Sequence, residues 1–346
     1  MGTKPASPYE YLASKDTHKL QQDFNDGLKP ERCNNCWIKE SNGSKSIRNY
    51  FTEPRDLTKI THMELRESNL CNFSCRMCNA SDSVVIEREI KQFPQLQKFF
   101  EPNNDVATSD ENWKQIFELA KDVESINLTG GEPMLMKRYY DFLDHLISIG
   151  KENIKLNIYT NGSVFNPGFI KRLLKFSNAT LYFSIDAVGR VAEYQRRGTT
   201  WYVIKQNMIC HANLPIKIKL HSTITAYSIL DVSNLADYFI ELFQMQCNAT
   251  FLPFTAHIAR SPKPLEFTNL NLDLRLMAVK QIDSAITKLA AVNYDFFSIY
   301  IKELTTARTQ LLTRKECNFE RFMNMTKALD RARKENFEDV FGYKLT

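Results

Sequence analysis

Three cysteines stand close together in the first quarter of the chain, with the spacing C-x3-C-x2-C. They are Cys71, Cys75 and Cys78. Thiolates are the usual ligands of iron–sulfur clusters, and a short loop can wrap around one cubane. Three protein ligands leave one iron of a four-iron cluster open, much as a catalytic zinc keeps an open position. That iron is then free to bind a small molecule through nitrogen and oxygen.

Two other interpretations of these cysteines stay open at this point. A structural zinc site needs four ligands, usually cysteine and histidine. The loop offers no fourth cysteine or histidine, and His62 stands well before it. The second alternative is a chance clustering of three thiols. A non-catalytic protein that binds iron–sulfur or zinc is therefore an alternative to an enzyme.

A Gly-Gly-Glu-Pro segment follows later in the chain. Gly130 and Gly131 let the backbone approach a ligand closely, and Glu132 offers a carboxylate to an ammonium group. Glycine is scarce, with 11 among 346 residues, so a glycine pair is informative. In isolation, the segment is also compatible with an ordinary turn that carries a surface glutamate.

Three more short motifs come after it, in the segments TNG, SIDA and YQRRG. Asn161 belongs to the first, which by itself is a plain turn. Ser184 and Asp186 belong to the second, which by itself caps a helix. Arg196 and Arg197 belong to the third, and two surface arginines are normally solvated. Each motif alone is therefore a weak signal.

Alternating strands and helices must position these loops. The pattern predicts strands at residues 60–67, 125–128, 153–159, 180–185, 216–223 and 249–254. Helices are expected at 135–149, 167–176, 201–211 and 232–244, and another opens at a capping box of Thr108 and Glu111. Strands separated by helices imply a parallel sheet with right-handed crossovers. Every candidate loop follows a strand, at the sheet edge where parallel α/β folds bind ligands.

The motifs together resemble the radical S-adenosylmethionine superfamily in their order and in their placement after successive strands. The similarity covers about residues 60–255 and implies an α/β fold, a partial (β/α)6 TIM-like barrel of parallel strands. We therefore divide the chain into an N-terminal segment at 1–58, the barrel at 59–258 and a C-terminal helical segment at 259–346. The two flanking segments are the candidates to cover the mouth of the barrel.

The resemblance implies a role for each matched residue. The three cysteines would ligate a 4Fe-4S cluster, and Met77 would lie near the adenine. Glu132 would accept a hydrogen bond from the amino group of S-adenosylmethionine, and Arg196 (or Arg197) would pair with its carboxylate. The remaining implied cofactor-binding residues are Gly130 and Gly131 beside the methionine moiety, Asn161 in the TNG turn, and Ser184 and Asp186 on the ribose side.

The resemblance also implies the activity. The reduced cluster would cleave S-adenosylmethionine to a 5′-deoxyadenosyl radical, which abstracts hydrogen from a substrate. The expected partners are an electron donor of the flavodoxin or ferredoxin type and a substrate that is a peptide, a protein or a small metabolite. A peptide is favoured by analogy only.

A second cysteine pair, Cys33 and Cys36, lies in the segment CNNCW. A lone C-x2-C is half of a metal site, so zinc and a second iron–sulfur cluster are both open. The segment resembles the auxiliary-cluster element of twitch-type radical S-adenosylmethionine proteins. It departs from them because residues 1–32 contain no cysteine, so we expect a truncated or incomplete element. The remaining cysteines at 210, 247 and 317 are expected to be small core residues.

The composition argues against membrane, nucleic-acid-binding and secreted proteins. Hydrophobic residues make up 43% of the chain and no window is apolar enough to span a membrane. The net charge of +5 is too small to argue for nucleic-acid binding. The first thirty residues do not resemble a signal peptide. Eight cysteines without such a signal lead us to expect a reducing, cytoplasmic environment.

Overall fold

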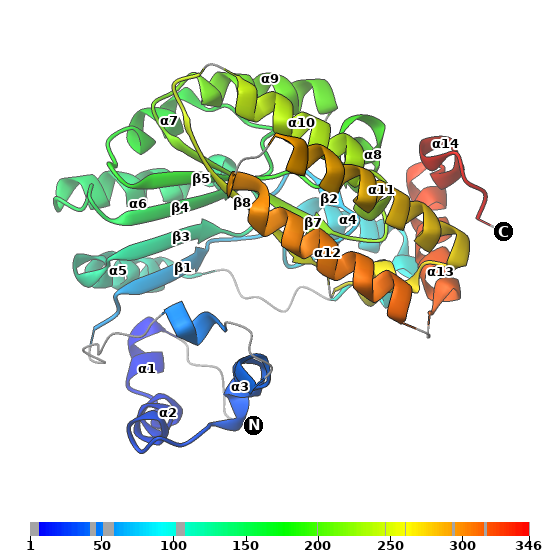
Figure 1. Cartoon of the computed structure of the whole chain (residues 1–346). Coiled ribbons are helices and arrows are strands. Elements are labelled where there is room, and N and C mark those ends of the chain that lie inside the picture. Colours follow the sequence, from blue (N-terminus) through cyan, green and yellow to red (C-terminus); the bar gives the residue numbers. More distant parts are fainter. Residues whose placement is uncertain are drawn as a thin grey trace. The chain divides into compact units, whose positions relative to one another are not determined.

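The computed structural model describes residues 7–41, 46–50, 59–101, 108–198, 200–245, 247–259, 261–292, 295–314 and 317–345 (Figure 1). The chain divides into two units. Unit 1 comprises Met1–Met63 with Thr108–Glu124, and unit 2 comprises Glu64–Ala107 with Ser125–Thr346. Unit 2 contains all of the candidate loops, namely the three-cysteine loop and the GGEP, TNG, SIDA and QRR segments. Unit 1 contains the C-x2-C pair.

A six-stranded parallel sheet forms the centre of unit 2. Its order is β1-β3-β4-β5-β7-β8, so strands that follow one another in this list are neighbours in space. The strands are β1 (His62–Arg66), β3 (Ser125–Thr129), β4 (Lys155–Thr160), β5 (Ala179–Ser184), β7 (Lys217–Ile224) and β8 (Thr250–Ile258). This confirms the predicted α/β class with six strands separated by helices. The sheet does not close, since the described residues of β1 and β8 are its two edges.

Alternation along the strands divides the sheet into two faces. Ile218, Leu220, Ser222 and Ile224 of β7 are buried, whereas Lys219, His221 and Thr223, which alternate with them, are half-buried and polar. Helices cover the apolar face, because Phe183 of β5 contacts His211 and Phe254 of β8 contacts Phe239. We call the opposite, polar face the inner face of the sheet.

Helices connect and follow the strands of unit 2 (Figure 1). Those between strands are α4 (Val84–Gln92), α6 (Lys137–Ser148), α7 (Pro167–Leu173), α8 (Gly189–Gln195), α9 (Trp201–Ala212) and α10 (Val232–Gln244). Those after β8 are α11 (Leu272–Ala291), α12 (Ser298–Thr313), α13 (Phe319–Arg333) and α14 (Phe337–Phe341). α11 packs against α10 and α12, and α12 contacts β8. None of the helices in the described part of the chain is both long and apolar enough to cross a membrane.

Two very short strands were not expected from the sequence. β2 (Ser74–Cys75) lies in the three-cysteine loop and pairs antiparallel with β6 (Arg196–Arg197). Cys75 is directly opposite Arg196 in this ladder. Strands of two residues are too short to show a hydrophobic period in the sequence. This pair nevertheless joins the three-cysteine loop to the arginine segment that follows the SIDA loop.

Unit 1 is mainly helical in its described residues, apart from the start of β1. It contains α1 (Pro8–Leu12), α2 (Lys15–Asn25), α3 (Asn34–Ser41) and α5 (Asp110–Leu119). The predicted capping box of Thr108 and Glu111 is wrong, because Ser109 is the N-cap of α5 and its hydroxyl accepts from the backbone N–H of Asn112 at 3.1 Å. Ser109 stands one residue later than the predicted cap, and its side chain satisfies an open N–H group at the start of the helix.

Candidate metal centre

One cavity collects most of the residues that the motifs singled out. Its volume is about 870 Å3 and part of it is open to solvent. Nine of the predicted site residues line it: Cys71, Cys75, Met77, Cys78, Gly130, Gly131, Asn161, Ser184 and Arg196. Residues that the motif analysis missed also line it, among them Phe73, Thr129, Tyr159 and Thr223. Thr129, Tyr159 and Thr223 lie near the ends of their strands on the inner face of the sheet. The alternation of polar and apolar residues along those strands could have predicted them.

The three thiols differ in their surroundings. Cys75 is buried, and Cys71 and Cys78 are half-buried. Burial raises the pKa of Cys71 to about 12. The thiol of Cys78 donates a hydrogen bond to the sulfur of Cys75, which lowers the pKa of Cys75 and raises that of Cys78. A bound cation would remove the protons, since metals bind the thiolate.

The GGEP loop lies directly against the cysteine loop. The backbone N–H of Gly131 donates to Ser68 O at 3.2 Å, and that of Glu132 donates to Leu70 O at 2.8 Å. A Cβ at Gly131 would lie 2.2 Å from Leu70 O and 2.9 Å from the backbone N of Cys71. No side chain fits there, so the glycine is required by the close approach of two backbones.

Glu132 is completely buried and does not line the cavity. Its carboxylate accepts from the backbone N–H of Met134 at 3.2 Å, the hydroxyl of Thr160 at 2.9 Å and the backbone N–H of Asn161 at 2.7 Å. Burial raises its pKa to about 7. Glu132 therefore joins the GGEP loop to the TNG loop, and its predicted contact with an amino group stays a prediction.

Asn161 continues this connection back to the first loop. Its side-chain amide donates to Asn72 Oδ1 at 3.0 Å and approaches the sulfur of Cys71 at 3.8 Å. Its own Oδ1 accepts from the backbone N–H of Ser163 at 2.9 Å. Three loops from three strands are thus held to one another by hydrogen bonds around the cavity.

Arg196 and Asp186 form a buried ion pair, with 2.5 Å between Arg196 Nε and Asp186 Oδ2. Asp186 also accepts from the side chain of Gln195 at 2.9 Å and from the backbone N–H of Thr223 at 2.7 Å. Arg196 lines the cysteine cavity, whereas Arg197 pairs with Glu335. Asp186 therefore orients the guanidinium that faces the cavity.

A second, smaller cavity of about 370 Å3 adjoins the first through shared lining residues. Ser184 and Asp186, both predicted on the ribose side, line it together with Phe73, Ile204 and Trp201. Its lining residues include both apolar and polar side chains, and the surface that they present to the cavity is mainly apolar, which is typical of a small-molecule pocket.

Arg76, which the motif analysis did not use, is completely buried within the cysteine loop. Its Nη2 is 2.6 Å from both Asp330 Oδ1 and Glu335 Oε2. Its guanidinium stacks 3.5 Å above the ring of Tyr194, whose hydroxyl donates to Asp330 at 2.8 Å. The cysteine loop is therefore fastened to the end of α13 and the residues that follow it.

Among the residues that the structure describes, no group of three or more His, Cys, Asp or Glu side chains is placed to hold one metal ion. The zinc alternative for the three cysteines therefore gains no fourth ligand among the residues that the structure describes. Cys33 and Cys36 lie in unit 1, half-buried, at the start of α3. The role of this pair stays a prediction.

Comparison with known proteins gives a sequence match. Residues 68–224 match the profile of the Radical SAM superfamily. These residues include the three-cysteine, GGEP, TNG and SIDA loops and Arg196. No curated protein matches the sequence of this chain.

Several solved structures are similar over part of the chain. SuiB of Streptococcus suis bound to precursor peptide SuiA is 17% identical, with a TM-score of 0.45 over 71% of this chain and 52% of that chain. The protein anSMEcpe with bound AdoMet is 14% identical, with a TM-score of 0.47 over 72% of this chain and 60% of that chain. TYW1 with a lysine-pyruvate adduct is 13% identical, with a TM-score of 0.33 over 64% of this chain and 72% of that chain. The chain spans a little over half the length of SuiB.

Proposed function

Since residues 68–224 form a Radical SAM superfamily domain, we propose that this chain is a radical S-adenosylmethionine enzyme. In this proposal Cys71, Cys75 and Cys78 hold a 4Fe-4S cluster. The observation that carries the proposal is the single cavity lined by all three thiols and by the loops at the ends of three successive strands. A fourth thiol is not among its lining residues, which suits a cluster with one iron left for the nucleotide.

The cofactors supply the difficult chemistry when bound, namely one-electron reductive cleavage of S-adenosylmethionine at the cluster. The chain binds and orients them. Arg196, fixed by Asp186, faces the cavity as a cation suited to the methionine carboxylate. Gly131 keeps the backbone of the second loop against the first, and Glu132 holds the third loop in place.

Anaerobic reconstitution tests this function. The protein is loaded with iron and sulfide, reduced, and mixed with S-adenosylmethionine. We expect release of 5′-deoxyadenosine and methionine, measured by liquid chromatography and mass spectrometry, and none from the same protein without iron. A loaded protein that binds iron but releases no 5′-deoxyadenosine would instead support the alternative, a non-catalytic iron–sulfur or zinc protein.

A twitch-type auxiliary site at Cys33 and Cys36 is a finer part of the proposal. It rests on the motif resemblance, and the two half-buried thiols are compatible with a second cluster. We expect the double variant Cys33→Ala/Cys36→Ala to bind less iron and sulfide per chain than the parent after reconstitution. An unchanged iron and sulfide content would reject the auxiliary cluster and leave the first cluster untouched.

The substrate and the electron donor are also proposals. We propose an electron donor of the flavodoxin or ferredoxin type. SuiB has been crystallised with a precursor peptide, and this makes a peptide one candidate substrate for the present chain, beside a protein side chain or a small metabolite. The side chains on the inner face of the sheet narrow this choice of substrate.

A further inference from the structure

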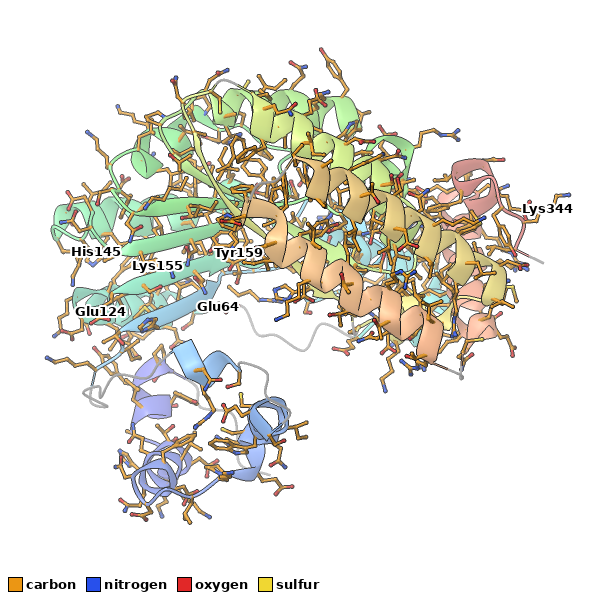
Figure 2. The ribbon with its side chains drawn as sticks, viewed as in Figure 1. Glu64, Glu124, His145, Lys155, Tyr159 and Lys344 are labelled. Atoms are coloured by element: carbon orange, nitrogen blue, oxygen red, sulfur yellow. The ribbon has the colours of Figure 1, made fainter. Side chains whose placement is uncertain are left out.

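Basic and aromatic side chains gather on the inner face of the sheet, next to the cysteine cavity. We call them the inner-face cluster: Tyr159 of β4, Tyr182 of β5, Lys219 and His221 of β7, and His257 of β8. Figure 2 labels Tyr159 on β4, together with Lys155 at the start of the same strand. Tyr159 also lines the cysteine cavity, whereas the other four side chains are not among its lining residues.

The rings of the cluster contact one another across neighbouring strands. Tyr159 and Tyr182 stack with ring centroids 4.5 Å apart, and Tyr159 meets His221 edge-on at 6.1 Å. His221 and His257 lie 4.7 Å apart, and His221 Nδ1 is 3.0 Å from the hydroxyl of Thr255. The ammonium of Lys219 lies 5.5 Å from the centre of the Tyr182 ring. The cluster is therefore one continuous surface across four strands.

The charge on this surface is not balanced by the protein. The sequences of β4, β5, β7 and β8 contain no aspartate or glutamate. Across the described residues, Lys219 makes no ion pair, and its neighbour Lys155 is also positive. Asp186, the first acidic residue after β5, is already paired with Arg196. Glu64 of β1 acts on the other end of the cluster, since burial, followed by the effects of Tyr182 and Glu64, raises the pKa of Tyr159. No carboxylate of the described residues is among the groups that shift the pKa of Lys219.

A half-buried lysine without a carboxylate partner has a free-energy cost that a bound anion would offset. Burial lowers the pKa of Lys219, and the positive charge of Lys155 adds to this effect. Burial, followed by the effect of His257, lowers the pKa of His221 to about 4, so its imidazole is neutral at pH 7. Lys219 is thus the cation of the site, and His221 is an uncharged hydrogen-bonding group beside it.

We infer that the inner-face cluster binds the carboxylate of a small substrate, with Lys219 as the counter-ion and Tyr159 and Tyr182 as a flat surface for the rest of the molecule. A carboxylate fits better than a phosphate, because Lys219 lies over the Tyr182 ring and balances a monoanion, whereas Lys155 is exposed at the start of β4. This inference deepens the proposed function by assigning a substrate class to the same site.

The register of β7 also limits the length of the substrate. Thr223 lines the cysteine cavity, and His221 and Lys219 precede it by two and four residues on the same face. At about 3.3 Å per residue these positions lie about 7 Å and about 13 Å from Thr223. A molecule the size of an amino acid or a dipeptide would reach from Lys219 to the cavity, and this is why we assign a small molecule and not a long peptide.

Binding of a carboxylate and of its matched amide tests the inference. The probes are hippurate and its neutral primary amide, titrated calorimetrically into the reconstituted protein with S-adenosylmethionine and without reductant. We expect the parent to bind hippurate about tenfold more tightly than the amide or better. Lys219→Met should lose this preference, and Lys219→Arg should retain it. Lys205→Met, which removes a surface lysine paired with Glu241, is the matched control and should behave like the parent.

Three outcomes would overturn the inference. They are equal binding of hippurate and the amide, failure of the parent to bind hippurate, and an unchanged preference in Lys219→Met. A pentapeptide with a free C-terminus serves as a further arm, and tighter binding of it than of hippurate would overturn the assignment of a small molecule. Failure of the proposed function is measured separately. Adding reductant to the same sample tests whether 5′-deoxyadenosine is released, whereas the titration measures binding alone and needs no turnover.

Discussion

Replacing Cys75 with serine is expected to abolish iron binding at the three-cysteine loop and to leave the chain folded. Cys75 is buried in the short β2–β6 ladder, and serine has nearly the same size but is a far weaker iron ligand than a thiolate. Two remaining cysteines would not retain the cluster. Iron and acid-labile sulfide per chain, measured after anaerobic reconstitution, should fall by the content of this one cluster, leaving at most what Cys33 and Cys36 hold, and 5′-deoxyadenosine release should disappear.

The matched control is Cys210→Ser. The core position expected for Cys210 is wrong, because this cysteine is exposed on α9. Its replacement should therefore change neither the iron content nor the circular dichroism spectrum. If Cys75→Ser retained the parental iron content, the three-cysteine loop would not be the cluster site. If Cys75→Ser does not fold, as a lost circular dichroism signal would show, Cys71→Ser is tested in its place. Cys71 is half-buried in the same loop, so its replacement disturbs the packing less.

Replacing Arg76 with methionine should destabilise the protein more than any surface substitution. The change leaves Asp330 and Glu335 without the buried guanidinium that each contacts at 2.6 Å. Removing one partner of a buried ion pair typically costs about 3–5 kcal/mol of unfolding free energy. Urea unfolding followed by circular dichroism should show this loss. Iron content should fall as well, because Arg76 stands between two of the proposed ligands.

Arg308→Met is the control for this prediction. Arg308 also pairs with an aspartate, Asp283, but both side chains are largely exposed on α11 and α12. Its removal should leave the urea midpoint unchanged, since exposed pairs contribute little. An Arg76→Met midpoint equal to that of the parent would show that the contacts of the cysteine loop with Asp330 and Glu335 do not hold it in place.

The strands and most site loops could be predicted because local signals coincide there. Hydrophobic alternation marks each strand, and a short motif follows the strand where it ends. GGEP after β3 and TNG after β4 are of this kind, and both loops border the cysteine cavity. Strand order in a parallel sheet then brings such loops to one edge without any knowledge of side-chain contacts.

The contacts that complete the site could not be predicted in the same way. Arg76 and Asp330 are 254 residues apart in the sequence, and no local pattern relates them. Glu132 has the residue type expected of an ammonium ligand, but only the folded chain shows that three donors from its own protein surround the carboxylate. The inner-face cluster could not be predicted from the sequence, because polar residues that alternate along a strand are also typical of an ordinary solvated face.

The C-x2-C-W segment of unit 1 has a packing role that does not involve its cysteines. The guanidinium of Arg48 lies 3.6 Å above the ring of Trp37 and pairs with Glu40 at 3.2 Å. Glu40 also accepts from the hydroxyl of Ser46, and the indole N–H of Trp37 donates to Pro30 O at 3.1 Å. Selection for a stable fold alone can therefore preserve this tryptophan, glutamate, serine and arginine in related proteins that no longer bind metal at the cysteine pair. A genome survey that takes these residues as the mark of a second cluster would count such proteins wrongly.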